Sequence, residues 1–121
     1  MFYTKEFETQ IEGIEDKKGL KKIISWLDRL ACRTPDKPYM WQKIKGCKDI
    51  NLYELKPRPY RIAVLVVNGR FCLCLYIWKV EKDTSCKKRR EIEKAIKTAR
   101  RHKNEFEKFV RKIQDRPRVH S

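Results

Sequence analysis

Apolar residues recur at helical spacing in two stretches near the start of the chain. The first covers residues 3–14, with Thr4 as a suitable N-cap and Gly13 as a suitable end. In the second, residues 20–31, an apolar stripe continues at helical spacing until Pro35 stops it. Only a short turn separates the two stretches, so the pattern predicts an N-terminal helical hairpin.

The middle of the chain changes to an alternation of period two, which indicates β-strands. The predicted strands cover residues 51–56, 60–67 and 70–80. The last two flank Asn68-Gly69, which is a strong hairpin signal because both turn residues accept a positive φ. With a two-residue turn, Ile62 lies opposite Leu75 on a wholly apolar face that packs against helices, and on the other face Arg61 lies opposite Tyr76.

Helical spacing returns after Ser85, a suitable N-cap, and Pro117 lies beyond the end of the apolar stripe. Residues 87–118 contain 14 Lys or Arg and 5 Asp or Glu, so this helix is strongly basic. The sequence therefore predicts one α+β domain over residues 1–121. It combines the helical hairpin, an antiparallel sheet of three to four strands with a central Asn-Gly hairpin, and a long basic C-terminal helix.

Charge points to the class of partner. The chain has 31 Lys or Arg and 16 Asp or Glu, a net charge of +15, which favours nucleic acid, an anionic membrane surface or an acidic protein. No apolar run reaches the roughly 18 residues of a membrane span. Charged residues interrupt the N-terminal apolar positions, unlike in a signal peptide. We therefore expect a cytoplasmic protein that uses no membrane.

Metal and cofactor signatures are missing from the sequence. The five cysteines form an odd set without a C-x-x-C pair, which favours reduced thiols acting as small apolar residues over a disulfide scaffold or a zinc site. No Gly-rich phosphate loop, H-E-x-x-H or paired-carboxylate motif occurs. We expect neither a metal nor a small-molecule cofactor.

Two groups of cations are candidates for RNA binding. The first stands at the ends of the central strands and combines cations with aromatic rings: Lys56, Arg58, Arg61, Lys79, Lys82, Tyr60, Tyr76 and Trp78. Guanidinium groups match phosphate geometry, and aromatic rings offer bases a stacking surface. The second opens the last helix: Lys87, Lys88, Arg89 and Arg90. The alternatives are a half-solvated sheet face with Arg61 stacked on Tyr76 and a solvated helix face.

Several of these segments together resemble a known family. They are L-Y-E-L-K at residues 52–56, Y-R-I at 60–62, the hairpin, the strand ending in W-K, and K-K-R-R-E-I-E-K-A at 87–95. This string resembles the RelE/HigB superfamily of bacterial toxins, especially its HigB-like, phage-derived branch. The resemblance covers residues 40–100 and implies a compact RelE-like fold in which helices pack on one face of an antiparallel sheet.

The resemblance also implies an activity. Such proteins are toxins of type II toxin–antitoxin systems, endoribonucleases that cleave mRNA, often on the ribosome, and are inhibited by a cognate antitoxin. By this resemblance Arg61 stabilises charge on the scissile phosphate, and Lys56, with a pKa lowered by its neighbours, takes the proton of the attacking 2′-OH. Lys79 and Lys82 fall near a basic position at the end of the last strand. The implied partners are mRNA, the ribosome with its rRNA, and the antitoxin.

One departure from the family keeps a second hypothesis open. Many members carry a tyrosine or histidine suited to proton transfer just after the last strand or near the C-terminus, and residues 81–86 contain neither. This difference favours a non-catalytic RNA- or DNA-binding module on the same fold. A third hypothesis is an interaction protein whose basic surface meets an acidic partner.

Overall fold

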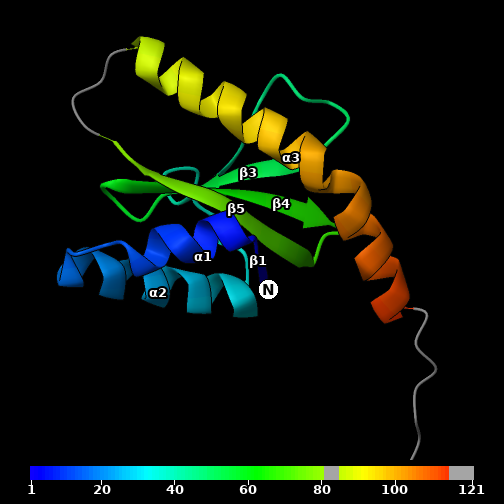
Figure 1. Ribbon diagram of the computed structural model, residues 1–121, viewed down its shortest axis with the longest axis horizontal. Coiled ribbons are helices and arrows are strands. Elements are labelled where there is room, and N and C mark those ends of the chain that lie inside the picture. Colours follow the sequence, from blue (N-terminus) through cyan, green and yellow to red (C-terminus); the bar gives the residue numbers. More distant parts are fainter. Residues whose placement is uncertain (81–84, 115–121) are drawn as a thin grey trace, which may run out of the picture.

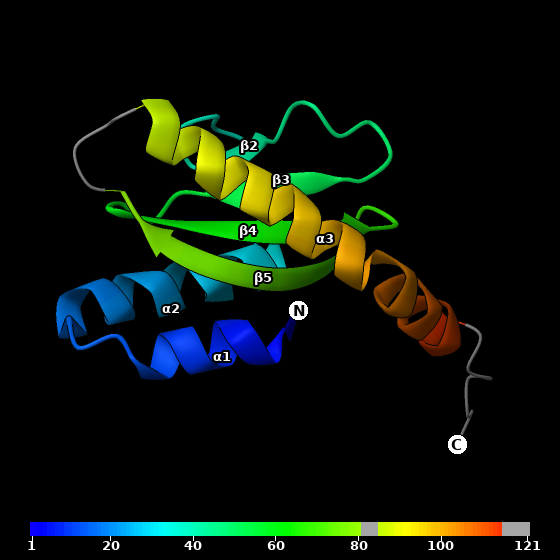
Figure 2. The same cartoon turned by 45° about the horizontal axis from the view of Figure 1, so that its top comes forward.

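The computed structural model describes residues 1–80 and 85–114, with side chains from residue 88 onward in the second range. It has three layers, with a sheet between a pair of helices and a single long helix (Figure 1). Helices α1 (Lys5–Glu12) and α2 (Lys17–Cys32) cover one face of the sheet, and α3 (Ser85–Gln114) crosses the other (Figure 2). The α+β fold class is confirmed, together with the helical hairpin and the long C-terminal helix.

The sheet contains five strands: β1 (Phe2–Tyr3), β2 (Trp41–Lys43), β3 (Leu52–Leu55), β4 (Tyr60–Val67) and β5 (Phe71–Lys79). Their order is β1-β5-β4-β3-β2, and every neighbouring pair is antiparallel except β1 with β5. The sheet therefore has more strands than the three to four predicted. The short strands β1 and β2 form its two edges, and β1 is parallel to its neighbour. Strands of two or three residues are too short for an alternating pattern to reveal.

Two polar side chains attach α1 to the sheet, and one of them also caps the helix. The Thr4 hydroxyl accepts a hydrogen bond from the Phe7 N–H and donates one to the Leu75 carbonyl at 2.6 Å. Further along the helix, the Gln10 amide donates to the carbonyl of Ile77 at 2.8 Å and accepts from its N–H at 2.9 Å. These contacts close the outer edge of β5, which would otherwise present unpaired backbone groups.

The hairpin between β4 and β5 has the predicted turn but a different register. Asn68 and Gly69 both have positive φ, at 54° and 71°. However, Val67 pairs with Phe71, so the loop contains three residues instead of two. This extra residue moves every partner on β5 by one position, and side chains in a strand alternate between faces.

A β-bulge moves the register by one more position between Ala63 and Val64. Arg61 consequently lies opposite Trp78, and the predicted pairing of Arg61 with Tyr76 is wrong. Because the two shifts add, the pairing partners at the open end of the hairpin are two residues away from those predicted with a two-residue turn.

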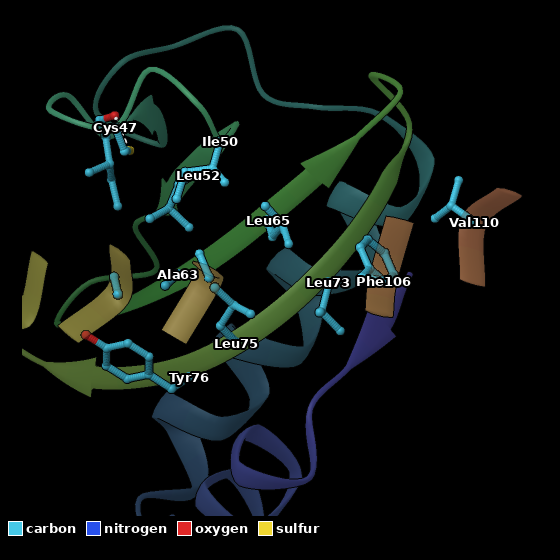
Figure 3. Close-up of a cluster of buried hydrophobic side chains, with 13 residues drawn as sticks. Cys47, Ile50, Leu52, Ala63, Leu65, Leu73, Leu75, Tyr76, Phe106 and Val110 are labelled. Carbon is cyan, nitrogen blue, oxygen red and sulfur yellow. Dashed lines mark hydrogen bonds between the residues drawn. The ribbon is translucent and has the colours of Figure 1, made fainter. Parts of the chain in front are cut away.

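Apolar side chains cover both faces of the sheet. The α1–α2 side is packed with, among others, Phe7, Ile23, Leu27, Ile62, Val64 and the free thiols Cys72 and Cys74. The α3 side is packed with, among others, Leu52, Ala63, Leu65, Leu73, Leu75, Phe106 and Val110 (Figure 3). The implied placement of helices on one face is therefore wrong, since α3 covers the second apolar face.

Small residues let α3 approach the sheet closely. Ala95 and Ala99 are fully buried between the helix and the strands. Exposed ion pairs from Glu6 to Lys94 and Arg101 hold one flank of the helix at 3.9 and 3.7 Å. No helix within the described residues is long and apolar enough to cross a membrane.

Candidate functional site

Two predicted site residues meet at one end of the sheet, on the face that α3 covers. Lys56 directly follows β3, and Arg61 is the second residue of the antiparallel neighbour β4. The first turns of α3 lie over this end, where the Tyr76 hydroxyl on β5 donates to the Glu91 carbonyl on the helix. Pairing of β3 with β4 thus places these two cations at the same end of the sheet.

A carboxylate fixes the orientation of Arg61. Glu54 Oε1 lies 3.1 Å from Arg61 Nε, and the two side chains are only 12% and 17% exposed. The Nη1 group of Arg61 also donates to the Tyr60 carbonyl at 3.2 Å. With two of its donor groups engaged, the guanidinium has a fixed orientation, and its remaining N–H groups suit the oxygens of a phosphate.

Glu54 was not among the predicted site residues, although it lies in the L-Y-E-L-K string that carries the family resemblance. The sequence did contain a signal for Glu54. It is a charged residue within a predicted strand, two positions before a candidate catalytic lysine. Its partner could not be recognised because the pairing of β3 with β4 is a tertiary property.

Lys56 is held by its backbone to the residue before β2 and by its side chain to β2 itself. Its N–H donates to the Met40 carbonyl at 2.9 Å, and its Nζ donates to Gln42 Oε1 at 2.7 Å. The ammonium group is therefore placed by the edge strand, while the residue itself continues from β3.

Burial lowers the pKa of Lys56 below the ordinary lysine value. The positive charges of Arg61, Lys88 and Arg58 lower it further, and the Glu54 carboxylate acts in the opposite direction. A lowered pKa gives Lys56 a larger neutral fraction near neutral pH than an exposed lysine has. Neighbouring charges were predicted to cause this shift, but burial makes the larger contribution.

Two of the predicted stacking residues are closed to a ligand. Tyr60 is 8% exposed and Tyr76 is 1% exposed, so their prediction as base-stacking side chains is wrong. The Tyr76 hydroxyl donates to the Glu91 carbonyl on α3, and burial raises the pKa of Tyr76. The causes differ: α3 covers the sheet face that carries Tyr76, which was predicted to be open, whereas Tyr60 packs into the core on the α1–α2 face.

Trp78 lies at the border of the site. It is partly buried against the α3-side core, with its ring centroid 5.2 Å from that of Tyr76. Its partner in register is Arg61, so the indole stands beside the guanidinium on the same face. Of the three predicted stacking residues, only Trp78 has surface left at this end of the sheet.

The remaining predicted residues are dispersed. Lys79 is exposed, pairs with Tyr60 and follows Trp78, so alternation places it on the α1–α2 face, away from Arg61. Arg58 is exposed in the loop before β4, where its carbonyl accepts from Lys22 Nζ at 2.9 Å.

The basic run at the start of α3 is described in part. Lys88, Arg89 and Arg90 are exposed on its first turns. Lys82 and the side chain of Lys87 lie outside the described residues. The RNA-binding role of this run stays a prediction.

The site offers cations and a proton acceptor, but not the ligands of a metal. Within residues 1–80 and 88–114, no three His, Cys, Asp or Glu side chains are grouped so that they could hold a metal ion. A fixed guanidinium next to a lysine of lowered pKa can bind a phosphate and accept a proton from a nearby hydroxyl.

Comparison with known proteins places the chain in a family and gives its fold. No protein-family model matches the sequence. An uncharacterized protein of Aquifex aeolicus (strain VF5) is 34% identical in an alignment over 99 residues, and the match covers 77% of this chain and 72% of that protein. The chain belongs to the family of that protein.

The fold is similar to that of a solved structure. One chain in the crystal structure of the archaeal RelE–RelB complex from Pyrococcus horikoshii OT3 aligns with a TM-score of 0.56 and 17% identity. The alignment covers 67% of this chain and 93% of that chain. The architecture is therefore RelE-like, and about a third of this chain lies outside the aligned part.

Proposed function

We propose that this protein is the toxin of a type II toxin–antitoxin system, an endoribonuclease of the HigB-like kind that cleaves mRNA on the ribosome. One observation carries the proposal: on a RelE-like fold, a carboxylate-oriented arginine stands at the same end of the sheet as a lysine of lowered pKa. These groups supply the charge stabilisation and the proton acceptor that cleavage of an RNA strand requires.

In the proposed reaction the ribose 2′-oxygen attacks the adjacent phosphorus. The 2′-OH proton passes to the neutral amine of Lys56, and Arg61 stabilises the negative charge that grows on the phosphoryl oxygens. The bond from phosphorus to the 5′-oxygen breaks, and that oxygen takes a proton from water. The products are a 2′,3′-cyclic phosphate and a 5′-hydroxyl end.

The flanking nucleotides meet cations on both sides of the proposed centre. Arg58 stands in the loop before β4, and Lys88, Arg89 and Arg90 stand on the first turns of α3. Such side chains bind phosphates without reading sequence. The partly exposed Trp78 provides a stacking surface for one base.

The proposal includes a protein partner. The structure similar to this chain is that of a RelE–RelB complex. By this likeness we propose a cognate antitoxin, and the net charge of +15 favours an acidic segment in it.

A second candidate function is a non-catalytic RNA-binding module. The burial of Tyr76 favours it, because this hydroxyl is engaged by α3 and cannot reach a leaving group. Such a module retains salt-dependent RNA binding but yields no cleavage products.

The deciding experiment incubates the purified full-length chain with mRNA, with and without ribosomes, and maps the new RNA ends. We expect cyclic-phosphate ends, and a loss of about 100-fold or more in cleavage rate for Arg61→Lys, which keeps the charge but loses the planar fork. Lys18→Ala, exposed on α2, is the matched control and retains the wild-type rate. RNA binding without cleavage by the wild type supports the non-catalytic module instead.

A further inference from the structure

Two polar side chains on neighbouring strands hold the two central cations of the site. Gln42 on β2 is the register partner of Glu54 on β3, so both side chains project from the same face. Gln42 Oε1 accepts from Lys56 Nζ at 2.7 Å, and Glu54 Oε1 lies 3.1 Å from Arg61 Nε. The lysine thus has a neutral acceptor, and the arginine has an anionic one.

This difference matches what each cation must do. A guanidinium keeps its charge in proteins, so a carboxylate fixes Arg61 without impairing its role. Lys56 must lose a proton to act as a base. A carboxylate in hydrogen-bond contact would hold it in the charged form, whereas an amide oxygen directs the amine with a much weaker effect on its charge.

The geometry also restrains the amine after it has lost a proton. A neutral amine keeps two N–H groups, and donation of one of them to Gln42 directs the lone pair away from β2. The backbone bond from Lys56 to Met40 keeps the two strands in this register.

We propose that Gln42 is a positioning residue, which aims the Lys56 amine at its substrate through a neutral acceptor. The proposal rests on the proposed function, in which Lys56 accepts the 2′-OH proton. The other charged groups that act on Lys56 are Glu54 on the same strand, Arg61 on β4, Lys88 on α3 and Arg58 in the intervening loop. These four groups change the pKa of Lys56 through their charge. Gln42 differs from them because its uncharged amide oxygen accepts the hydrogen bond from Lys56 Nζ.

The test uses Gln42→Glu and Gln42→Leu in the full-length chain. The pKa of Lys56 is measured by NMR titration of its 13Cε signal, assigned with a Lys56→Arg sample, and the pH dependence of kcat and KM for RNA cleavage is measured separately. Gln114→Glu at the far end of α3, where Gln114 contacts Asn68, is the matched control for the added charge.

We expect Gln42→Glu to raise the pKa of Lys56 by about one unit and to move the rising limb of the kcat profile to higher pH by the same amount. Above that limb its rate returns to the wild-type value. Gln42→Leu lowers the pKa and reduces kcat at every pH by about 10-fold with KM little changed, because orientation is lost. Gln114→Glu leaves both measurements at wild-type values.

The outcomes separate this inference from the proposed nuclease function. If the wild type cleaves RNA and Gln42→Glu changes neither the Lys56 pKa nor the profile, Gln42 has no positioning role and the inference is overturned. If the wild type cleaves no RNA, the nuclease proposal fails and the positioning role fails with it, while a pKa change in Gln42→Glu still reports the contact itself.

Discussion

The carboxylate of Glu54 lies 3.1 Å from the Nε of Arg61, and both side chains are largely shielded from solvent. An ion pair in such surroundings is less screened than one on the surface, and its geometry is more strictly defined. Two residues from different strands therefore act as one unit: β3 supplies the anion that orients a cation on β4.

Glu54→Gln should greatly lower the rate of RNA cleavage while the protein remains folded. The amide keeps the shape of the side chain but removes the charge that orients Arg61, so we expect kcat to fall by about 10- to 100-fold. RNA cleavage and thermal unfolding, measured on the same preparation, check this. Glu105→Gln, exposed on α3, is the control; an unchanged kcat in Glu54→Gln would show that the ion pair is only structural.

Cleavage should rise with pH through a pKa below that of an ordinary lysine. Lys56 acts as a base only when neutral, and because burial lowers its pKa, the neutral fraction increases at lower pH than for an exposed lysine. Single-turnover rates between pH 5 and about pH 10 measure this limb. Lys56→Arg, which stays protonated throughout, should abolish the limb, and a limb that persists in this variant would assign the base to another group.

Ala99→Leu should destabilise the fold by about 1–3 kcal/mol, because the added methyl groups overpack the contact between α3 and the sheet. Ala99 is fully buried there, whereas Lys97 on the same helix is exposed. The free energy of unfolding, measured in urea for Ala99→Leu and for the control Lys97→Leu, checks this. Equal stabilities would mean that α3 does not cover this face of the sheet in solution.

Gln10→Ala should weaken the outer edge of β5. The substitution leaves the N–H and carbonyl of Ile77 without their side-chain partner, at an expected cost of about 1–3 kcal/mol. Hydrogen exchange of the Ile77 amide should accelerate, and urea unfolding gives the stability change. Glu8→Ala on the exposed side of α1 serves as the control, and an Ile77 amide equally protected in both variants would argue against the side-chain bridge.

Local pattern was enough to predict most elements of the fold. The Thr4 cap, the Gly13 end and the turn at residues 68–69 lie where the sequence placed them, because each depends on the conformational preferences of a few neighbouring residues. The strands at 60–67 and 71–79 also match their alternating patterns closely. Lys56 and Arg61 belonged to a group of cations at predicted strand ends, and only the family resemblance singled them out.

Only the tertiary structure decided which side chains face each other. The three-residue loop and the bulge at Ala63 moved Arg61 opposite Trp78, and a shift of one position changes the partner of every residue beyond it. The docking of α3 on the second apolar face buried Tyr76, which the sequence had placed in the open. Periodicity along the chain specifies which face of an element is apolar, but the partner that covers this face is selected by packing between elements distant in the sequence.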